Sequence, residues 1–338
     1  MDQRTHSWIA IRAIALLEDE GKEQNLVSLL KPHAAKASAG AWIPDQVDAK
    51  RGGAGSGTDN HVLKMELYTG NQKDRFVVDK DALIKNVGTH RMAASLLQKD
   101  TSLDPAWWAA PYKGDAPKQG QHLPNRIMAL STMMKDELLM GDRRVDHLIP
   151  GDIRFAEYLD DSERTPEEMA AMDFFMLSHF VADASMPCHC DGRKLAGYSA
   201  GLHMELEKHW SSIVGTAFEK DRLIKGTATS KQILAQAKAL DTKFGLTFDP
   251  VSISDLLPDH DVWLEAIYLC RASFAIASIM APYKTYPYDD SRPAAPFAEV
   301  FGKGKEQILS AVDQAAMHDA VLNTAIVWKH IWNKVSTE

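Results

Sequence analysis

The segment 166–186, PEEMAAMDFFMLSHFVADASM, constrains the fold more than any other part of the chain. It opens with Pro166 and two glutamates, which is the usual chemistry of a first helical turn. Large apolar residues then recur on every side of the expected helix, so the helix has no broad polar face to present to water. The segment therefore predicts a long buried helix around which other elements must pack.

Further segments have the apolar spacing of helices, namely 7–18, 201–216, 230–241, 259–281 and 304–334. We expect Thr5 to cap the first of them, and residues 73–79 are the one short strand candidate. With 338 residues, of which 45% are apolar, the chain is long enough to bury a large core. These patterns predict an all-α fold with a single domain over residues 1–338 and an irregular insertion at about 70–160.

The formal net charge of -8 gives the chain no overall attraction to nucleic acids or anionic membranes. An anionic substrate would therefore need a local positive field, which bound metal ions supply. No run of about 20 apolar residues occurs, so no transmembrane segment is predicted. Arg12 interrupts the short N-terminal apolar run and no small-residue cleavage site follows, so we expect a helix there and not a signal peptide. As written, the chain is expected in the cytoplasm; if a native leader was removed, it would be secreted or periplasmic.

Two pairs of a histidine and an acid carry the chemistry of the sequence. His179 and Asp183 are spaced i, i+4 within the apolar helix, so their side chains share one face, and a buried pair of this kind needs a partner. His203 and Glu207 repeat the spacing, and His189 lies just past the end of the first helix. One such pair alone is usually a structural ion pair. Two pairs with a histidine between them are typical of a divalent metal site, and zinc takes imidazole and carboxylate ligands.

The central pattern, His-x3-Asp-x3-Pro-x-His followed by His-x3-Glu, resembles that of the zinc-dependent bacterial phospholipases C and the related single-strand-specific zinc nucleases. The stretch that begins at His6, His-Ser-Trp-Ile with Arg-Ala-Ile at 12–14, resembles the first helix of that family. Asp45, in Trp-Ile-Pro-Asp, and then His61 follow in the family order, and an aromatic last helix extends the resemblance over nearly the whole chain. The resemblance implies a multi-helix fold of the phospholipase C and zinc nuclease type, with a cluster of two to three zinc ions.

The resemblance also implies which residues hold each ion. One zinc would be bound by Asp45, His61, His179 and Asp183, and a second by His189, His203 and Glu207. The third would be bound by His6, by Asp183 as a bridge, and by backbone atoms of Met1, where the family has an N-terminal tryptophan.

The implied activity is hydrolysis of a phosphodiester by metal-activated water, with a phosphate ester, phospholipids included, as the substrate. Asp45 is the expected catalytic residue, because its carboxylate would orient or deprotonate that water. Lys50 or Arg51, on the Gly-rich loop that follows, would help to stabilise the transition state. The same two residues are also typical of an ordinary solvated loop, which is the interpretation that we favour.

The kind of phosphate ester is less constrained. Glu207 favours the phospholipase branch, because the nucleases usually have aspartate at that position. Choline selectivity is not predicted, since Gln46 and Thr58 stand where the choline-selective enzymes have aromatic residues. Two alternatives stay open: one is a non-catalytic, metal-stabilised helical protein, and the other is a zinc-dependent nuclease or nucleotidase that would stack bases on Trp42, Trp107 and Trp108. No stable nucleic-acid partner is expected, and the sequence leaves the oligomeric state open.

Other residues near these motifs are expected to lie away from the site. Cys188 and Cys190 flank His189 and should point elsewhere if His189 points in. His209 is expected on a different face of its helix from the paired ligands, and His318, which has no regular partner, is expected at the surface or as a capping residue.

Overall fold

The computed structural model describes residues 1–46, 61–63, 123–140, 165–191, 201–248, 261–281 and 297–336. Within these ranges the chain is all-α, as the sequence predicts, and contains no strand. The long helices are α1 (Gln3–Glu20), α8 (Leu123–Met140), α9 (Pro166–Ala184), α15 (Val262–Met280) and α17 (Glu306–Ser336). The shorter ones are α2 (Gln24–Leu30), η1 (Lys31–Lys36), α3 (Ala37–Gly40), α10 (Pro187–Cys190), α11 (Leu202–Val214), η4 (Thr216–Phe218), α12 (Lys220–Ile224), α13 (Ser230–Ala239), α14 (Asp241–Phe244) and α16 (Phe297–Val300).

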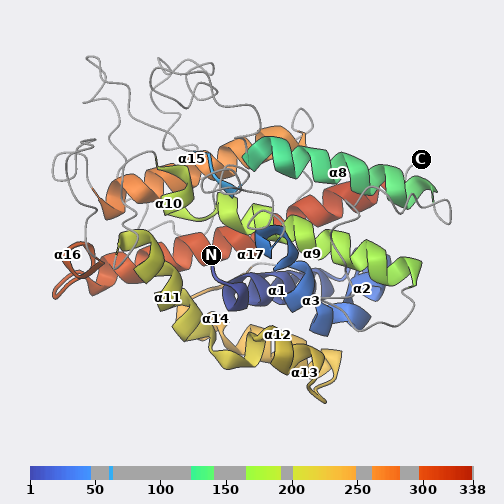
Figure 1. Ribbon diagram of the computed structural model, residues 1–338, viewed down its shortest axis with the longest axis horizontal. Coiled ribbons are helices and arrows are strands. Elements are labelled where there is room, and N and C mark those ends of the chain that lie inside the picture. Colours follow the sequence, from blue (N-terminus) through green and yellow to red (C-terminus); the bar gives the residue numbers. More distant parts are fainter. Residues whose placement is uncertain are drawn as a thin grey trace.

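Helix α1 runs through the middle of the molecule (Figure 1). Its residues from Thr5 to Leu17 are all buried, and α17, α13 and α9 pack around it. Asp2 caps the helix in place of the predicted Thr5: the Asp2 carboxylate accepts hydrogen bonds from the N–H groups of Arg4 and Thr5. A carboxylate suits this position because it faces the positive end of the helix dipole. The helix ends at Gly21, which adopts the left-handed conformation with φ 76°.

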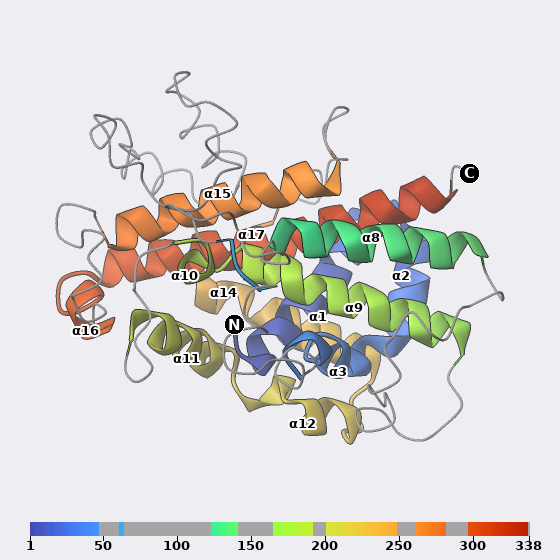
Figure 2. The same cartoon turned by 45° about the horizontal axis from the view of Figure 1, so that its top comes forward.

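The apolar segment forms α9 and begins where the sequence predicts. The Thr165 side chain accepts a hydrogen bond from the Glu168 N–H at 3.2 Å, and Pro166 occupies the first turn. Helices α8 and α15 lie on one side of α9, α1 and α3 lie on the other, and α17 packs along it (Figures 1 and 2). This enclosure is why α9 tolerates an apolar surface all round.

Helix α8 lies inside the interval predicted as an irregular insertion. In the part of that interval that the structure describes, the chain is a regular helix that buries Leu123, Ile127, Leu130 and Met134 against α9 and α15. The spacing of these four apolar residues is typical of a helix, and the prediction of an irregular insertion did not take it into account. Several other predictions fall outside the described residues: the strand candidate 73–79, the loop residues Lys50, Arg51 and Thr58, and the tryptophans Trp107 and Trp108.

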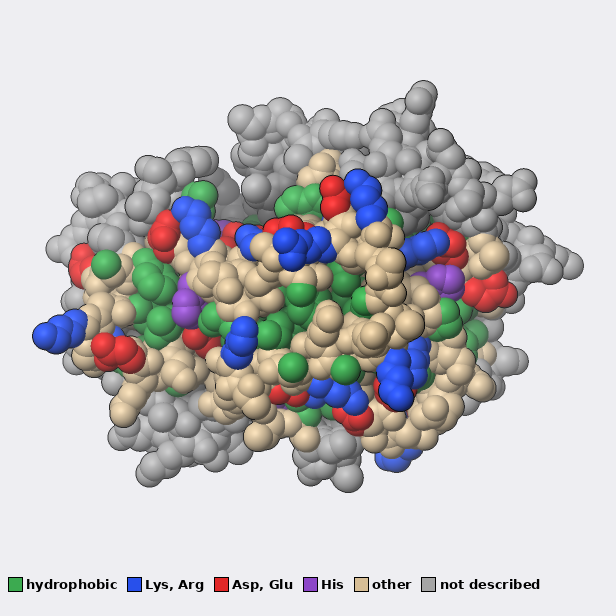
Figure 3. Space-filling view, turned by 90° about the horizontal axis from the view of Figure 1, so that it is seen from below, with side chains coloured by type: hydrophobic (Ala, Val, Ile, Leu, Met, Phe, Trp, Pro, Cys, Tyr) green, Lys and Arg blue, Asp and Glu red, His purple; other side chains and the backbone are tan. Residues whose placement is uncertain are grey.

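The surface carries charges of both signs. On the face drawn in Figure 3, Lys and Arg side chains are interspersed with Asp and Glu. Among the described residues, oppositely charged side chains also form ion pairs, such as Lys238 with Asp19 at 2.6 Å and Lys208 with Glu205 at 2.7 Å. No helix among those described is long and apolar enough to cross a membrane.

Candidate metal centre

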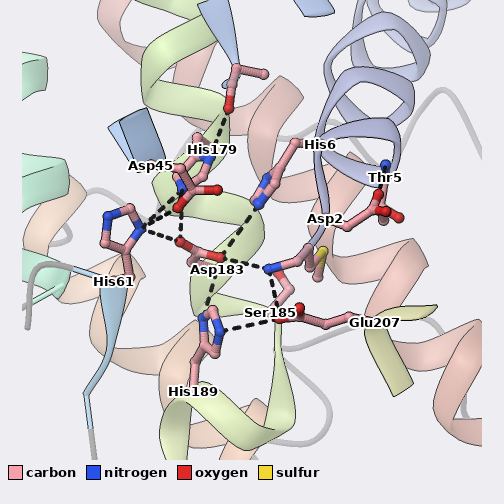
Figure 4. A network of polar contacts seen from close by, with 12 residues as sticks. Asp2, Thr5, His6, Asp45, His61, His179, Asp183, Ser185, His189 and Glu207 are labelled. Carbon is pink, nitrogen blue, oxygen red and sulfur yellow. Dashed lines mark hydrogen bonds and ion pairs between the residues drawn. The ribbon is translucent and has the colours of Figure 1, made fainter. Parts of the chain in front are cut away.

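Asp183 is the centre of a cluster of imidazoles that come from parts of the chain far apart in the sequence (Figure 4). It lies in the last turn of α9, and its side chain is only 1% exposed. Its Oδ2 lies 2.8 Å from His61 Nδ1 and 3.1 Å from His179 Nε2. Its Oδ1 lies 3.2 Å from His189 Nδ1 and 3.6 Å from His6 Nε2. One buried carboxylate therefore faces four imidazoles.

The orientation of His179 is set by the chain just after α3. Its Nδ1 lies 2.6 Å from the Ala41 carbonyl oxygen and donates to it. The other nitrogen, Nε2, is thereby directed at Asp183 and at His61 Nδ1, which is 3.0 Å away. Gly40 permits this close approach, because a Cβ at that position would lie 2.6 Å from Phe175 Cβ on α9.

His6 and Asp45 complete this side of the cluster. The His6 ring stacks on His179, with ring centroids 3.9 Å apart, and neither of its buried nitrogens has a hydrogen-bond partner among the described residues. Asp45 Oδ1 lies 3.5 Å from His179 Nε2 and 3.8 Å from His61 Nδ1. The Asp45 side chain is 32% exposed, so the cluster opens to solvent at this carboxylate.

A second group forms where α10 meets α11. His189 Nε2 lies 3.0 Å from His203 Nε2 and 3.7 Å from Glu207 Oε1, and the last two side chains lie 2.8 Å apart. The Met1 ammonium lies 3.1 Å from Glu207 Oε1 and 3.3 Å from Asp183 Oδ1. The amino group thus connects the second group to the first.

The acids in the cluster are held in their ionised form. Burial alone would raise the pKa of Asp183, but the Met1 ammonium, His179 and His189 hold it well below its usual range. Burial would likewise raise the pKa of Asp45, but the charge of His179 lowers it to about 2. Both carboxylates are therefore negative at neutral pH, as metal ligands must be.

The carboxylates of the cluster in turn favour the protonated, positively charged form of the basic groups beside them. Burial alone would lower the pKa of His179, but Asp183 and Asp45 raise it to about 10. Burial would also lower the pKa of the Met1 amine, but the charges of Glu207, Asp183 and Asp45 raise it to about 11. The chain itself thus places cations where the carboxylates converge.

The donor set fits a divalent metal ion. Two pairs of imidazole nitrogens, His61 with His179 and His189 with His203, approach to 3.0 Å beside a carboxylate oxygen. Only one hydrogen can lie between two nitrogens, whereas a metal ion accepts a lone pair from both. Burial lowers the pKa of His203 to about 4 and that of His6 well below its usual range, so both are neutral, which is the form that binds a metal.

The structure brings all nine predicted ligand residues into this one cluster. Three sets of side chains have ligand atoms within 4.8 Å of one another and could hold a metal ion: His6, Asp45 and His179; His61, His179 and Asp183; and His189, His203 and Glu207. The grouping differs from the expected one in that His6 lies with Asp45 and His179 as well as near Asp183. The reason is the stacking of the His6 and His179 rings.

Two features of the centre were not predicted from the sequence. One is the Ala41 carbonyl, which orients His179 and has no side-chain signal in the sequence. The other is the set of contacts that hold α11 in place, which are described below. The thiol of Cys190, which flanks His189, makes a contact outside the ligand groups, as predicted. It donates a hydrogen bond to the Ala184 carbonyl oxygen at 3.6 Å.

Comparisons of the chain with protein-family models, with curated proteins and with solved structures found no match. A functional assignment therefore depends on the residues of the cluster themselves.

Proposed function

We propose that the chain is a zinc-dependent hydrolase of phosphate esters, of the phospholipase C type, that cleaves a phosphodiester. The observation that supports this most is the buried carboxylate of Asp183, which is shared by imidazoles of adjacent ligand groups. Such sharing suits neighbouring metal ions that act together on one phosphate. The resemblance of the His179, Asp183 and His189 pattern to that of the zinc phospholipases C supports the same chemistry.

Zinc is the proposed metal because every ligand atom in the three groups is an imidazole nitrogen or a carboxylate oxygen. Divalent ions held there supply positive charge for the phosphate oxygens and lower the pKa of a bound water toward neutrality. The protein contributes the fixed geometry: the hydrogen bond from His179 to Ala41 selects the ring nitrogen that is left for the metal.

Asp45 is the proposed catalytic residue. Its side chain is 32% exposed while that of Asp183 is 1% exposed, so Asp45 is the carboxylate of this side that water and substrate can reach. Its pKa of about 2 makes it a weak base. It is therefore suited to accept a hydrogen bond from the attacking water and to orient it, more than to remove its proton.

We expect the substrate to meet the centre at the side chains that are still exposed. His203 and Glu207 are each 21% exposed and Asp45 is 32% exposed, whereas His6 and His179 are fully enclosed. The side of the cluster that holds Asp45 and the group of His203 and Glu207 thus each have a side chain that a phosphate can reach.

The experiment is an assay of the zinc-loaded protein on phosphatidylcholine vesicles, single-stranded DNA and a chromogenic phosphodiester. We expect turnover of the phospholipid and the chromogenic diester that a chelator abolishes and zinc restores. The Asp45→Asn variant should lower kcat by about 100-fold or more. Asp221→Asn, at a 74% exposed carboxylate of α12, is the matched control and should keep full activity. Full zinc occupancy without turnover of any substrate would instead favour the non-catalytic, metal-stabilised protein.

A nuclease or nucleotidase is the second candidate, and Trp42 is the observation that favours it. Trp42 is only partly buried and lies three residues before Asp45, next to the Ala41 carbonyl that orients His179. A partly exposed aromatic ring beside a metal centre suits the stacking of a nucleobase. Faster cleavage of single-stranded DNA than of phospholipid, lost in Trp42→Ala, would support this candidate.

A further inference from the structure

Helix α11 carries two of the ligands, His203 and Glu207, yet it lies at the edge of the molecule (Figure 1). It packs on α1 and α16, and its buried apolar residues Leu202, Leu206, Trp210 and Val214 form one stripe along the helix. Apolar contacts have little directional preference. The stripe therefore sets which side of α11 faces the core, but leaves the finer rotation of the helix, and with it the direction of its two ligands, to directional contacts.

Three consecutive residues of α11 are fixed by carboxylates of other helices. His209 Nε2 lies 2.8 Å from Asp313 Oδ2, and the Trp210 indole N–H donates to Asp313 Oδ1 at 2.7 Å. The Ser211 hydroxyl donates to Asp2 Oδ2. Asp313 belongs to α17, and Asp2 is the N-cap of α1, so α11 is tied to two of the long helices.

These hydrogen bonds determine the rotation that the apolar stripe leaves open. Successive helical residues are about 100° apart around the axis, so contacts at His209, Trp210 and Ser211 span about 200° of the helix. Asp313 is 7% exposed, and its two oxygens each face a different donor, one on each of two adjacent residues. Hydrogen bonds to a buried carboxylate are strong and directional. A turn of α11 in either direction would break at least one of them.

We propose that Asp313 is a positioning residue for the group of His189, His203 and Glu207, and that it acts by holding α11 in the rotation that directs the last two at His189. This inference rests on the proposed function only in that the group binds zinc. In the contacts among the described residues, Asp313 meets His209 and Trp210 and none of the three ligands. Its effect passes through His209 and Trp210, which lie just beyond Glu207 on the same helix.

The test is a zinc titration of the metal-free protein against a chromophoric chelator, with no activity assay. In Asp313→Ala we expect the affinity for one of the bound ions to fall about 10- to 100-fold, as for other groups that orient metal ligands. The affinity of the ions that involve His61 and Asp45 should stay within about twofold, because α11 provides none of their ligands. Asp313→Asn, which keeps an oxygen for the Trp210 N–H, should give a smaller fall.

Glu205→Ala is the matched control, since Glu205 is a carboxylate on α11 that pairs only with the exposed Lys208 in the contacts described. It should leave every affinity unchanged. If Asp313→Ala does not fold, His209→Ala removes one of the two hydrogen bonds to Asp313, at a residue that is 26% exposed, and it should weaken binding of the same ion to a smaller extent. Variants that lose stability but bind every ion as the wild type does would overturn the positioning role. A wild-type chain that binds no zinc would overturn the proposed function itself.

Discussion

Asp183 faces the Met1 ammonium and the rings of His6, His61, His179 and His189, so it contacts residues of more than one ligand group. A residue that faces several ligand groups should matter for several ions. We expect Asp183→Asn to remove two or more zinc ions per chain, whereas His203→Asn should remove one. Metal analysis of the gel-filtered proteins checks this prediction. Loss of a single ion in both variants would contradict the shared role of Asp183.

The protons held by the centre make metal binding dependent on pH. Because the pKa of His179 is raised to about 10 and that of the Met1 amine to about 11, both groups are protonated at neutral pH. A metal ion that binds there must displace a proton, so a higher pH favours binding. We expect zinc affinity to rise about tenfold per pH unit for each proton displaced, between about pH 6.5 and 8.5.

Calorimetric titration of the metal-free protein with zinc, in buffers with different ionisation enthalpies, measures how many protons are released on binding. His203→Ala is the comparison, because burial lowers the pKa of His203 to about 4 and the ring carries no proton to displace. Its loss should lower the affinity without changing the dependence on pH at the other group. An affinity that does not change with pH in the wild type would show that the protonated groups are not ligands.

At the level of single residues, the sequence predicts which side chains meet when both lie on one helix. The i, i+4 spacing of His179 with Asp183 and of His203 with Glu207 fixes a common face for each pair, and the structure retains both. It does not predict the Ala41 carbonyl, since every residue has one. It also predicts His318 as a surface or capping residue, whereas the residue is buried and its ring stacks on that of Phe248, with centroids 4.8 Å apart, a partner that spacing along the chain cannot identify.

At the level of elements, the contact of α3 with α9 sets the geometry of His179. Gly40→Ala would place a methyl group 2.6 Å from Phe175 Cβ and 3.2 Å from Met172 Cε, so α3 and the Ala41 carbonyl must shift. We expect the free energy of unfolding to fall by about 1–3 kcal/mol. Zinc affinity at the His179 groups should fall as well. Urea denaturation and chelator competition measure the two effects.

Gly21→Ala is the control for this substitution. Gly21 has a left-handed φ of 76° but no atom within 4 Å of the added Cβ. It should therefore cost about 1–2 kcal/mol of stability and leave the zinc affinity as it was. An equal effect of both variants on metal affinity would mean that the α3 contact has no specific role.

The existence of most helices is predictable from periodicity, but their ends and surroundings are less so. Helix α9 begins at Pro166 as predicted, whereas α1 begins before Thr5 because Asp2 provides the cap. The prediction of an irregular insertion at about 70–160 treats that interval as one segment, so it does not include helix α8. The sequence predicts that His209 lies on a different face of α11 from His203 and Glu207. In the structure, His209 contacts Asp313 on α17.

At the level of the whole molecule, α1 and α17 are also joined at the end far from the centre. Lys329 lies 2.7 Å from Glu20, with side chains only 5% and 1% exposed. Removal of one partner leaves a buried charge, so Lys329→Met should lower the free energy of unfolding by about 3–5 kcal/mol. The double variant with Glu20→Leu should recover much of that loss. Chemical denaturation checks both, and equal instability of the single and double variants would contradict the ion-pair explanation.

The convergence of the ligands lies beyond what local pattern can establish. His61 and Asp183 are 122 positions apart, and no periodicity shows that they meet at 2.8 Å. The resemblance to a family predicted this meeting through the order of its motifs. Asp313 and Asp2, the carboxylates that anchor α11, belong to no sequence motif. Their contacts with α11 follow only from the three-dimensional packing of the helices.

The Met1 ammonium and a doubly protonated His179 leave the centre with little excess negative charge before any ion arrives. The polypeptide can thus complete its folding in a zinc-poor environment without strong repulsion among its own acids. Metallation would then be a late event, an exchange of protons for zinc in a finished pocket. In that case the local supply of the ion, and not the rate of synthesis, decides when the centre is filled.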